Sequence, residues 1–289
     1  ITQNGEIVAD GTYDYRLTSG DNQDGLYINY GLTEVALLAQ GDNALTLNAE
    51  GNTNNAADLS ARVTGSGDLR IATDTDVSLS DSENDYTGAT WVTAGTLKMG
   101  NNNVLGNTRL LNLADGTRLD MNGYAQTLQN LNTETGSMLD FHDGSLTVNN
   151  GTVAGNLTGN GSLNVASGEL DISSDNPDMT AQTTIAADGT VRMLASQALG
   201  TGNVSNQGTL YLGQQGSTLA SYQVGSLANS GTVVLGHSDS AGNAVAGTTL
   251  TVNGDYSGDN GHLRFNTVLG ADDSLTDKMV VTGYTSGNS

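Results

Sequence analysis

The stretch that decides the fold is GSLTVNNGTVAGNLTGNGSLNVASGELDI, residues 144–172. It holds three copies of one short pattern: a glycine, a small or polar residue, and two apolar residues separated by one position. The copies are GSLTV (144–148), GSLNV (161–165) and GELDI (168–172). Because residues i and i+2 of a strand point to the same face, each copy predicts a turn followed by a half-buried strand.

The same pattern recurs along most of the chain. Further copies are GDLRI (67–71), GTLKM (95–99), GTVRM (189–193), GTLYL (208–212), GTVVL (231–235) and GHLRF (261–265), with stretched forms GTRLDM (116–121), GSMLDF (136–141) and GTTLTV (247–252). Gly95 and Gly116 are 21 residues apart, and Gly116 and Gly136 are 20 apart. Repetition at such a period is typical of a solenoid. The shorter gap of seven residues from Gly161 to Gly168 predicts two strands within one coil.

We therefore expect an all-β, right-handed, three-sided parallel β-helix of about 12–14 coils, with almost no α-helix. Residues 1–249 are expected to form the stem, and residues 250–289 a C-terminal segment continuous with it. The alternative is an antiparallel sandwich, which would need regular two-residue Asn-Gly turns between strands. Asn-Gly pairs occur, but at variable distances from the strands, so they favour the solenoid.

Composition narrows the classes of function. Among 289 residues there are only nine Lys and Arg, no Cys, and a formal net charge of −22. Nucleic acid depends on basic side chains for binding and is excluded as an expected partner. The lack of Cys excludes disulfides and thiol chemistry. No apolar run approaches the roughly 20 residues that span a bilayer, and we expect any targeting signal or anchor to lie outside this sequence.

Longer segments resemble a known family. Residues 87–106 (TGATWVTAGTLKMGNNNVLG) and 180–200 (TAQTTIAADGTVRMLASQALG) resemble the recurring pattern of autotransporter passengers. Residues 250–289, which include LTVNGDYSGDNGHLRF, look like the pertactin-like segment that precedes the membrane barrel. Residues 24–38 (DGLYINYGLTEVALL) resemble a segment of AIDA-type passengers. The chain is therefore similar to the C-terminal portion of an AIDA-type, pertactin-like autotransporter adhesin passenger.

That resemblance implies a protein exposed on the outer membrane of a Gram-negative bacterium, attached to the membrane only through a C-terminal barrel outside this sequence. It implies a non-enzymatic adhesin whose partner is another copy of itself on a neighbouring cell, or host matrix or glycan, with cell aggregation and biofilm formation as the outcome. It also implies that residues 250–289 begin an autochaperone region, which nucleates folding. The alternatives are a structural stem that presents an adhesive region elsewhere, and a polysaccharide-acting β-helix enzyme.

Candidate binding residues are few. The densest acidic stretch comprises Asp74, Asp76, Asp81, Glu83 and Asp85, which predict a solvated loop or a weak partner site. A run of amides, Asn101, Asn102 and Asn103, is expected to contribute to polar rows on the stacked coils. The three histidines do not occur in a catalytic-triad pattern, and no cofactor or metal motif is present, so we expect neither catalytic residues nor a cofactor.

Overall fold

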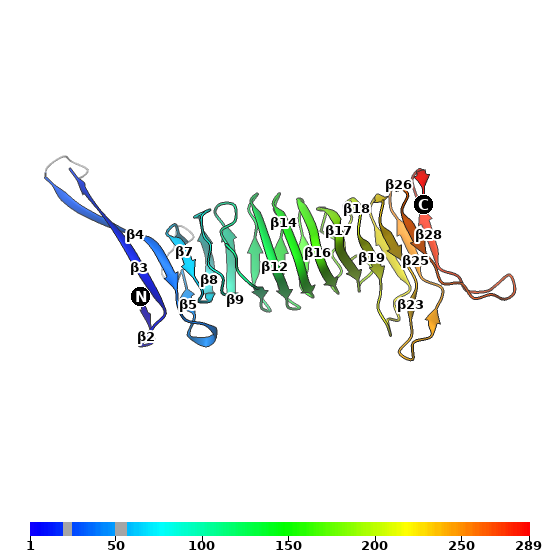
Figure 1. The fold of residues 1–289 in the computed structure, drawn as a ribbon, viewed down its shortest axis with the longest axis horizontal. Coiled ribbons are helices and arrows are strands. Elements are labelled where there is room, and N and C mark those ends of the chain that lie inside the picture. Colours follow the sequence, from blue (N-terminus) through cyan, green and yellow to red (C-terminus); the bar gives the residue numbers. More distant parts are fainter. Residues whose placement is uncertain (20–24, 50–56) are drawn as a thin grey trace.

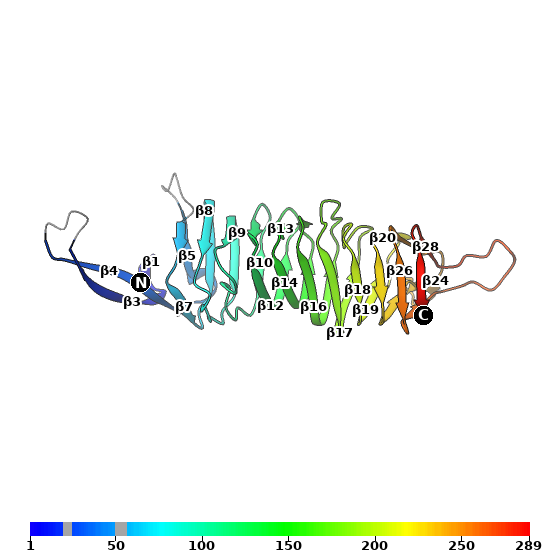
Figure 2. The ribbon, with the colours of Figure 1, turned by 90° about the horizontal axis from the view of Figure 1, so that it is seen from above.

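The computed structural model describes residues 1–19, 25–49 and 57–289. They form one elongated rod in which the chain advances steadily from end to end (Figures 1 and 2). The only helical element in these ranges is the single 3₁₀ turn η1 (Gly41–Asn43). No helix within them is long and apolar enough to cross a membrane. The prediction of an all-β parallel solenoid is confirmed.

Three parallel ladders of strands form the sides of the rod, and we name them faces A, B and C in the order in which the chain visits them from β5 onward. Face A is built from β5 (Leu45–Leu47), the first halves of β8 (Leu69–Leu79) and β9 (Thr90–Met99), β10 (Leu111–Leu113), the second halves of β12 (Ala125–Thr133), β14 (Ser145–Val153), β16 (Ser162–Ile172) and β17 (Gln182–Met193), then β19 (Thr209–Leu212), β22 (Thr232–Val234) and β27 (His262–Arg264).

Face B contains β6 (Ala57–Leu59), the second halves of β8 and β9, β11 (Arg118–Asp120), β13 (Met138–Asp140) and β15 (Asn156–Thr158), and farther along the rod β20 (Ser221–Val224), β25 (Thr249–Val252) and β28 (Lys278–Val281). Face C contains the end of β4 (Tyr27–Leu37), β7 (Arg62–Gly65), the first halves of β12, β14, β16 and β17, then β18 (Val204–Asn206), β21 (Leu227–Asn229), β26 (Tyr256–Asp259) and β29 (Thr285–Asn288).

The rod has about nine turns, fewer than the 12–14 expected. The estimate assumed that every residue belongs to a coil, and two parts of the chain do not. At the N-terminal end, β1 (Thr2–Gln3), β2 (Glu6–Ile7), β3 (Ala9–Thr18) and most of β4 form antiparallel hairpins. Near the C-terminal end, the hairpin of β23 (His237–Ser238) and β24 (Ala244–Val245) and the loop 265–277 are inserted between coils. The sandwich alternative is wrong, because the coils pair in parallel; an Asn-Gly pair, Asn4-Gly5, does form a two-residue hairpin turn, between β1 and β2.

The apolar residues of the repeat form the core. Leu146 and Val148, Leu163 and Val165, and Leu170 and Ile172 are all buried. The seven-residue gap predicted two strands within one coil, and this is confirmed. GSLNV and GELDI lie on faces C and A of the same coil, within β16. Copies of the repeat therefore occur on all three faces, and one coil can contain more than one copy.

The repeat glycines allow the coils to stack closely at one corner. A Cβ atom on Gly208 would lie 2.1 Å from the carbonyl oxygen of Gly189, and one on Gly231 would lie 2.1 Å from that of Gly208. Real Cβ atoms do not approach a carbonyl oxygen so closely, so these positions admit no side chain without displacing a neighbouring coil.

Buried amide side chains join consecutive coils from inside. Asn84 accepts a hydrogen bond from the backbone N–H of Val63 at 2.7 Å and donates to the carbonyl of Val104 at 2.8 Å. Asn176 does the same between Leu157 and Ala198, at 2.8 Å each. Each amide thus satisfies backbone groups of the coils before and after its own, which a buried corner requires.

Candidate interaction faces

The outward side chains form rows because the coils pair in register. In each ladder, the middle residue of a strand lies directly over the middle residue of the strand in the next coil. Adjacent strands lie about 4.8 Å apart, so each row presents side chains at that spacing. The three rows differ in chemistry.

Face A carries charged and aromatic side chains. Its row is Thr46, Arg70, Trp91, Asn112, Asn132, Thr152, Asp171, Arg192, Tyr211, Val234 and Arg264. Arg192 lies 4.3 Å over the ring of Tyr211 and 3.3 Å from the carboxylate of Glu169. Burial, together with the neighbouring Glu169 carboxylate, raises the pKa of Asp171 to about 6. Face A therefore changes charge in mildly acidic solution.

Face B carries the acidic row Asp58, Ser78, Lys98, Asp120, Asp140 and Thr158. Asp120 and Asp140 are directly paired in the ladder, and each has a basic partner. Nδ1 of His142 lies 2.8 Å from Oδ1 of Asp120, and Arg118 forms an ion pair with Asp140. The hydrogen bond and charge of Asp120 raise the pKa of His142.

Asp120, Asp140 and His142 place three potential metal-ligand atoms within 4.8 Å of one another. The oxygen atoms are already engaged: Oδ1 of Asp120 accepts the Asn122 N–H at 2.9 Å, and Oδ1 of Asp140 accepts the His142 N–H at 3.0 Å. With Arg118 on the other oxygen of Asp140, both carboxylates already have partners within the protein. Sequence reasoning missed it because the two aspartates lie 20 residues apart; the signal was the repeated Leu-Asp before Met121 and Phe141.

From β12 to β29, face C carries only uncharged side chains in its row, whereas β4 and β7 contribute the charged pair Glu34 and Arg62. The row is Thr127, Thr147, Asn164, Thr184, Ser205, Ala228, Ser257 and Ser286. A parallel row contains Ala125, Ser145, Ser162 and Gln182, in which the hydroxyls of Ser145 and Ser162 are 2.9 Å apart. A shallow groove crosses this face between β17, β18, β21 and β26. Hydroxyl and amide groups both donate and accept hydrogen bonds, so this face offers both at regular spacing.

The acidic residues singled out from the sequence do not form one site. Asp74 and Asp76 are exposed at the corner from face A to face B, within β8. Asp81 and Glu83 lie at the next corner, where Oδ1 of Asp81 accepts the Glu83 N–H at 2.7 Å. Asp85 begins the face C segment and pairs with Arg62 of the preceding coil at 2.7 Å. Val77 and Leu79, between these two corners, belong to the end of β8 and are buried.

The three asparagines lie at the corner from face B to face C and bond to neighbouring coils. The Nδ2 of Asn101 donates to the Ser80 carbonyl at 3.3 Å. Oδ1 of Asn102 accepts the Ala125 N–H at 2.9 Å, and Asn103 donates its backbone N–H to the Ala125 carbonyl at 2.9 Å. Their side chains therefore stabilise a corner, and the regular polar row lies elsewhere, on face C.

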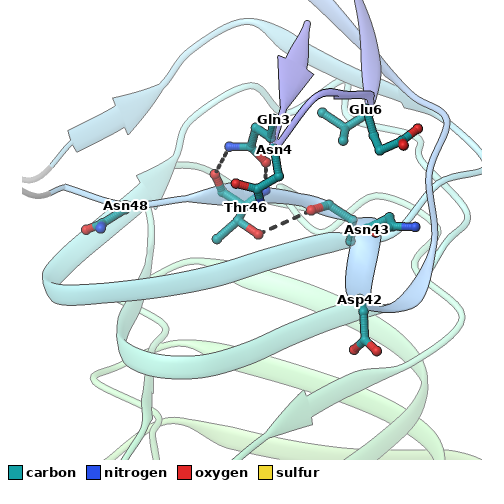
Figure 3. A pocket seen from close by; sticks show the side chains of 9 residues that line it. Gln3, Asn4, Glu6, Asp42, Asn43, Thr46 and Asn48 are labelled. Carbon is teal, nitrogen blue, oxygen red and sulfur yellow. Dashed lines mark hydrogen bonds between the residues drawn. The ribbon is translucent and has the colours of Figure 1, made fainter.

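The first strand of face A is covered by a side chain and not left as a free edge (Figure 3). The amide of Gln3 donates to the carbonyl of Thr46 and accepts its N–H, both at 2.8 Å. The side chain thus imitates a neighbouring strand, which protects an edge from further pairing. A hollow beside it is lined by Asn4, Glu6, Asp42, Asn43 and Asn48, among others.

A three-sided rod of parallel coils with rows of polar side chains defines the class of β-solenoid proteins. In a comparison with known proteins, residues 222–289 match the family model of the type 1 autochaperone domain. This match and the autotransporter relatives support an autotransporter passenger domain. The relatives place it in a secreted or cell-surface protein of Gram-negative bacteria.

The chain spans only a small part of the length of the curated relatives that it matches. It is 51% identical over 213 residues to the uncharacterized protein YuaQ of Escherichia coli K12, covering 73% of this chain and 16% of YuaQ. It is 45% identical over 214 residues to the uncharacterized lipoprotein YdeK of the same organism, with coverages of 73% and 16%. It is 31% identical over 238 residues to the adhesin BmaC autotransporter of Brucella suis, covering 82% of this chain and 6% of BmaC. No solved structure gives a significant match.

Proposed function

We propose that this chain is part of a non-enzymatic surface adhesin that holds cells together through contacts between copies of face C. The observation that carries the proposal is the uncharged row of Thr, Ser and Asn along that face, on a protein whose net charge is −22. Two such rods repel each other, and a face without charges in its row is where they approach at the lowest electrostatic cost.

Many weak contacts along a rigid rod supply the strength. Each hydrogen bond that replaces water contributes little, on the order of 1 kcal/mol. A row repeated at every coil multiplies such contacts without any single tight site, and many rods on each cell add avidity. The adhesin name of the BmaC relative supports the same class of function.

The experiment uses micron-sized beads coated with the chain, and measures how fast they clump and settle. Thr127→Asp with Thr147→Asp places two charges on adjacent coils of face C, and clumping is expected to fall at least tenfold. Thr209→Asp with Thr232→Asp is the matched control, because it adds the same two charges on adjacent coils of face A. Clumping that falls equally in both variants, or in neither, contradicts the proposal for face C.

The alternative function is a stem that holds an adhesive region away from the membrane. The match of residues 222–289 to an autochaperone domain supports it, since a chain that seeds folding need not bind a partner. Beads that stay dispersed at every salt concentration support the stem. An enzyme acting on polysaccharide is the third candidate, for which the Glu169–Asp171 carboxyl pair is the place to look. Release of new reducing ends from a glycan, lost in Asp171→Asn, would establish it.

A further inference from the structure

The N-terminal hairpin of β3 and β4 leaves one apolar face uncovered. The hairpin extends beyond the coils in both views (Figures 1 and 2). Its directly opposed pairs Tyr13–Leu32, Tyr15–Tyr30 and Leu17–Ile28 lie on one side. Asp14 and Arg16 lie on the other side, where they form an exposed ion pair at 3.3 Å. We call the first side the tyrosine face.

The tyrosine face is ordered by contacts among its own rings. Tyr30 lies between Tyr13 and Tyr15, with ring centroids 5.9 Å from each. Alternate residues of β3 point to the same side, so Tyr13, Tyr15 and Leu17 share the side of the buried Ala9. The tyrosine face therefore continues the inner surface of the solenoid. A two-stranded ribbon is marginally stable in water unless one face is packed against something. Its arrangement is therefore suited to a partner with a flat apolar surface.

The exposed area is large enough for a dimer. Tyr13, Tyr15 and Tyr30 are 47%, 68% and 69% exposed, and Leu17 and Ile28 are 66% and 69% exposed. With about 200 Å² for an aromatic side chain, these residues present about 600 Å² on each copy. Two such faces in contact would bury about 1,200 Å², the lower end of the range for specific interfaces.

We propose that the tyrosine face binds the same face of a second copy of this chain, so that two rods join through their β3–β4 hairpins. Two flat ribbons related by a two-fold axis are self-complementary, because each presents the same central Tyr15–Tyr30 pair. Contact at the ends keeps the sides of two bodies of net charge −22 apart, and the tyrosine face itself carries no charge. This contact does not rest on face C, and the two proposals fail separately.

Sedimentation of the chain over a range of concentrations tests the dimer. A monomer–dimer equilibrium is expected, and Tyr15→Ser with Tyr30→Ser raises the dissociation constant at least 100-fold. Leu269→Ser with Leu275→Ser is the control, since these residues are 95% and 62% exposed in the loop at the other end of the rod. A wild-type chain that stays monomeric overturns the proposal and leaves the face to a different partner. The proposal is also overturned if the two leucine substitutions weaken the dimer as much as the two tyrosine substitutions do. That result would indicate contact between the hairpin of one copy and the loop 265–277 of the other.

Cross-linking tests the geometry without requiring a loss of binding. The chain has no Cys, so Tyr15→Cys and Asp14→Cys each provide one thiol, on opposite sides of the same strand. Facing sheets pack about 10 Å apart, so a bismaleimide with a spacer of about that length bridges two copies. Tyr15→Cys is expected to cross-link at least tenfold faster than Asp14→Cys. Equal rates overturn the face-to-face arrangement. In the bead assay, the comparison of Thr127→Asp/Thr147→Asp with Thr209→Asp/Thr232→Asp reports on face C independently, because both variants keep the tyrosine face.

Discussion

At the residue scale, His142 shows how stacking creates an interaction that neither coil has alone. His142 lies in a turn, where it and Asp143 both adopt positive φ, at 41° and 62°. That backbone directs the imidazole toward Asp120 of the preceding coil, 22 residues earlier in the chain. The hydrogen bond favours the protonated ring and raises the pKa of His142.

The raised pKa gives a prediction with a definite sign. A histidine whose pKa is higher in the folded state contributes stability that is fully present below its unfolded value of about 6.5 and lost as pH rises through the folded value. Proton NMR of the imidazole is expected to give a midpoint above 6.5, and Asp120→Asn is expected to lower it. An unchanged His142 midpoint in Asp120→Asn contradicts the assignment.

At the element scale, three of the glycines that open a repeat act through close packing of coils. On face A, Gly189, Gly208 and Gly231 follow one another at the same corner. None of the three has a positive φ, so their role is to leave room for a neighbouring carbonyl oxygen. The spacing between coils at this corner therefore depends on the absence of a side chain.

Gly208→Ala is expected to lower the free energy of unfolding by about 1–3 kcal/mol, the usual cost of overpacking. Its Cβ would meet carbonyl oxygens of Gly189 and Ala186 at 2.1 and 2.3 Å. Gly31→Ala is the matched control, because a Cβ there has no atom within 4 Å, and its effect is expected within about 0.5 kcal/mol. Urea denaturation followed by circular dichroism measures both. Equal stability of the two variants would show that the coils separate at no cost.

At the scale of the whole molecule, the rod combines a strong net charge with one uncharged row. The charge of −22 belongs to the entire chain, whereas the face C row has none. Repulsion between the bodies of two rods and contact between their faces therefore oppose each other, and salt changes only the first. The Debye length falls from about 30 Å at 0.01 M to about 8 Å at 0.15 M ionic strength.

Clumping of coated beads is accordingly expected to become at least threefold faster when ionic strength rises from 0.01 to 0.15 M, because screening reduces repulsion and leaves hydrogen bonds in place. Beads carrying an inert acidic protein control for non-specific aggregation and should remain dispersed at both concentrations. If salt slows the clumping, ion pairs such as those of face A carry the association instead of face C.

Much of the fold and little of the candidate surface could be predicted from the sequence. The positions of Leu146 and Val148 as core residues followed from a period of two, since alternation is a local property of a strand. The number of turns did not follow, because hairpins and inserted loops use the same short strands as coils. The acidic residues from Asp74 to Asp85 appeared as one cluster in the sequence, but two corners of the rod separate them.

By itself, the sequence determined that this protein is a parallel β-solenoid, because repetition and alternation specify what each coil must bury. The tertiary structure decided which side chains meet outside. Thr147, Asp171 and Arg192 occupy the same place in the repeat, yet the first lies on face C and the other two on face A. A strand's face depends on where the preceding turn directs the chain, and register then joins residues some 20 positions apart. The uncharged row and the tyrosine face exist only after that stacking and pairing.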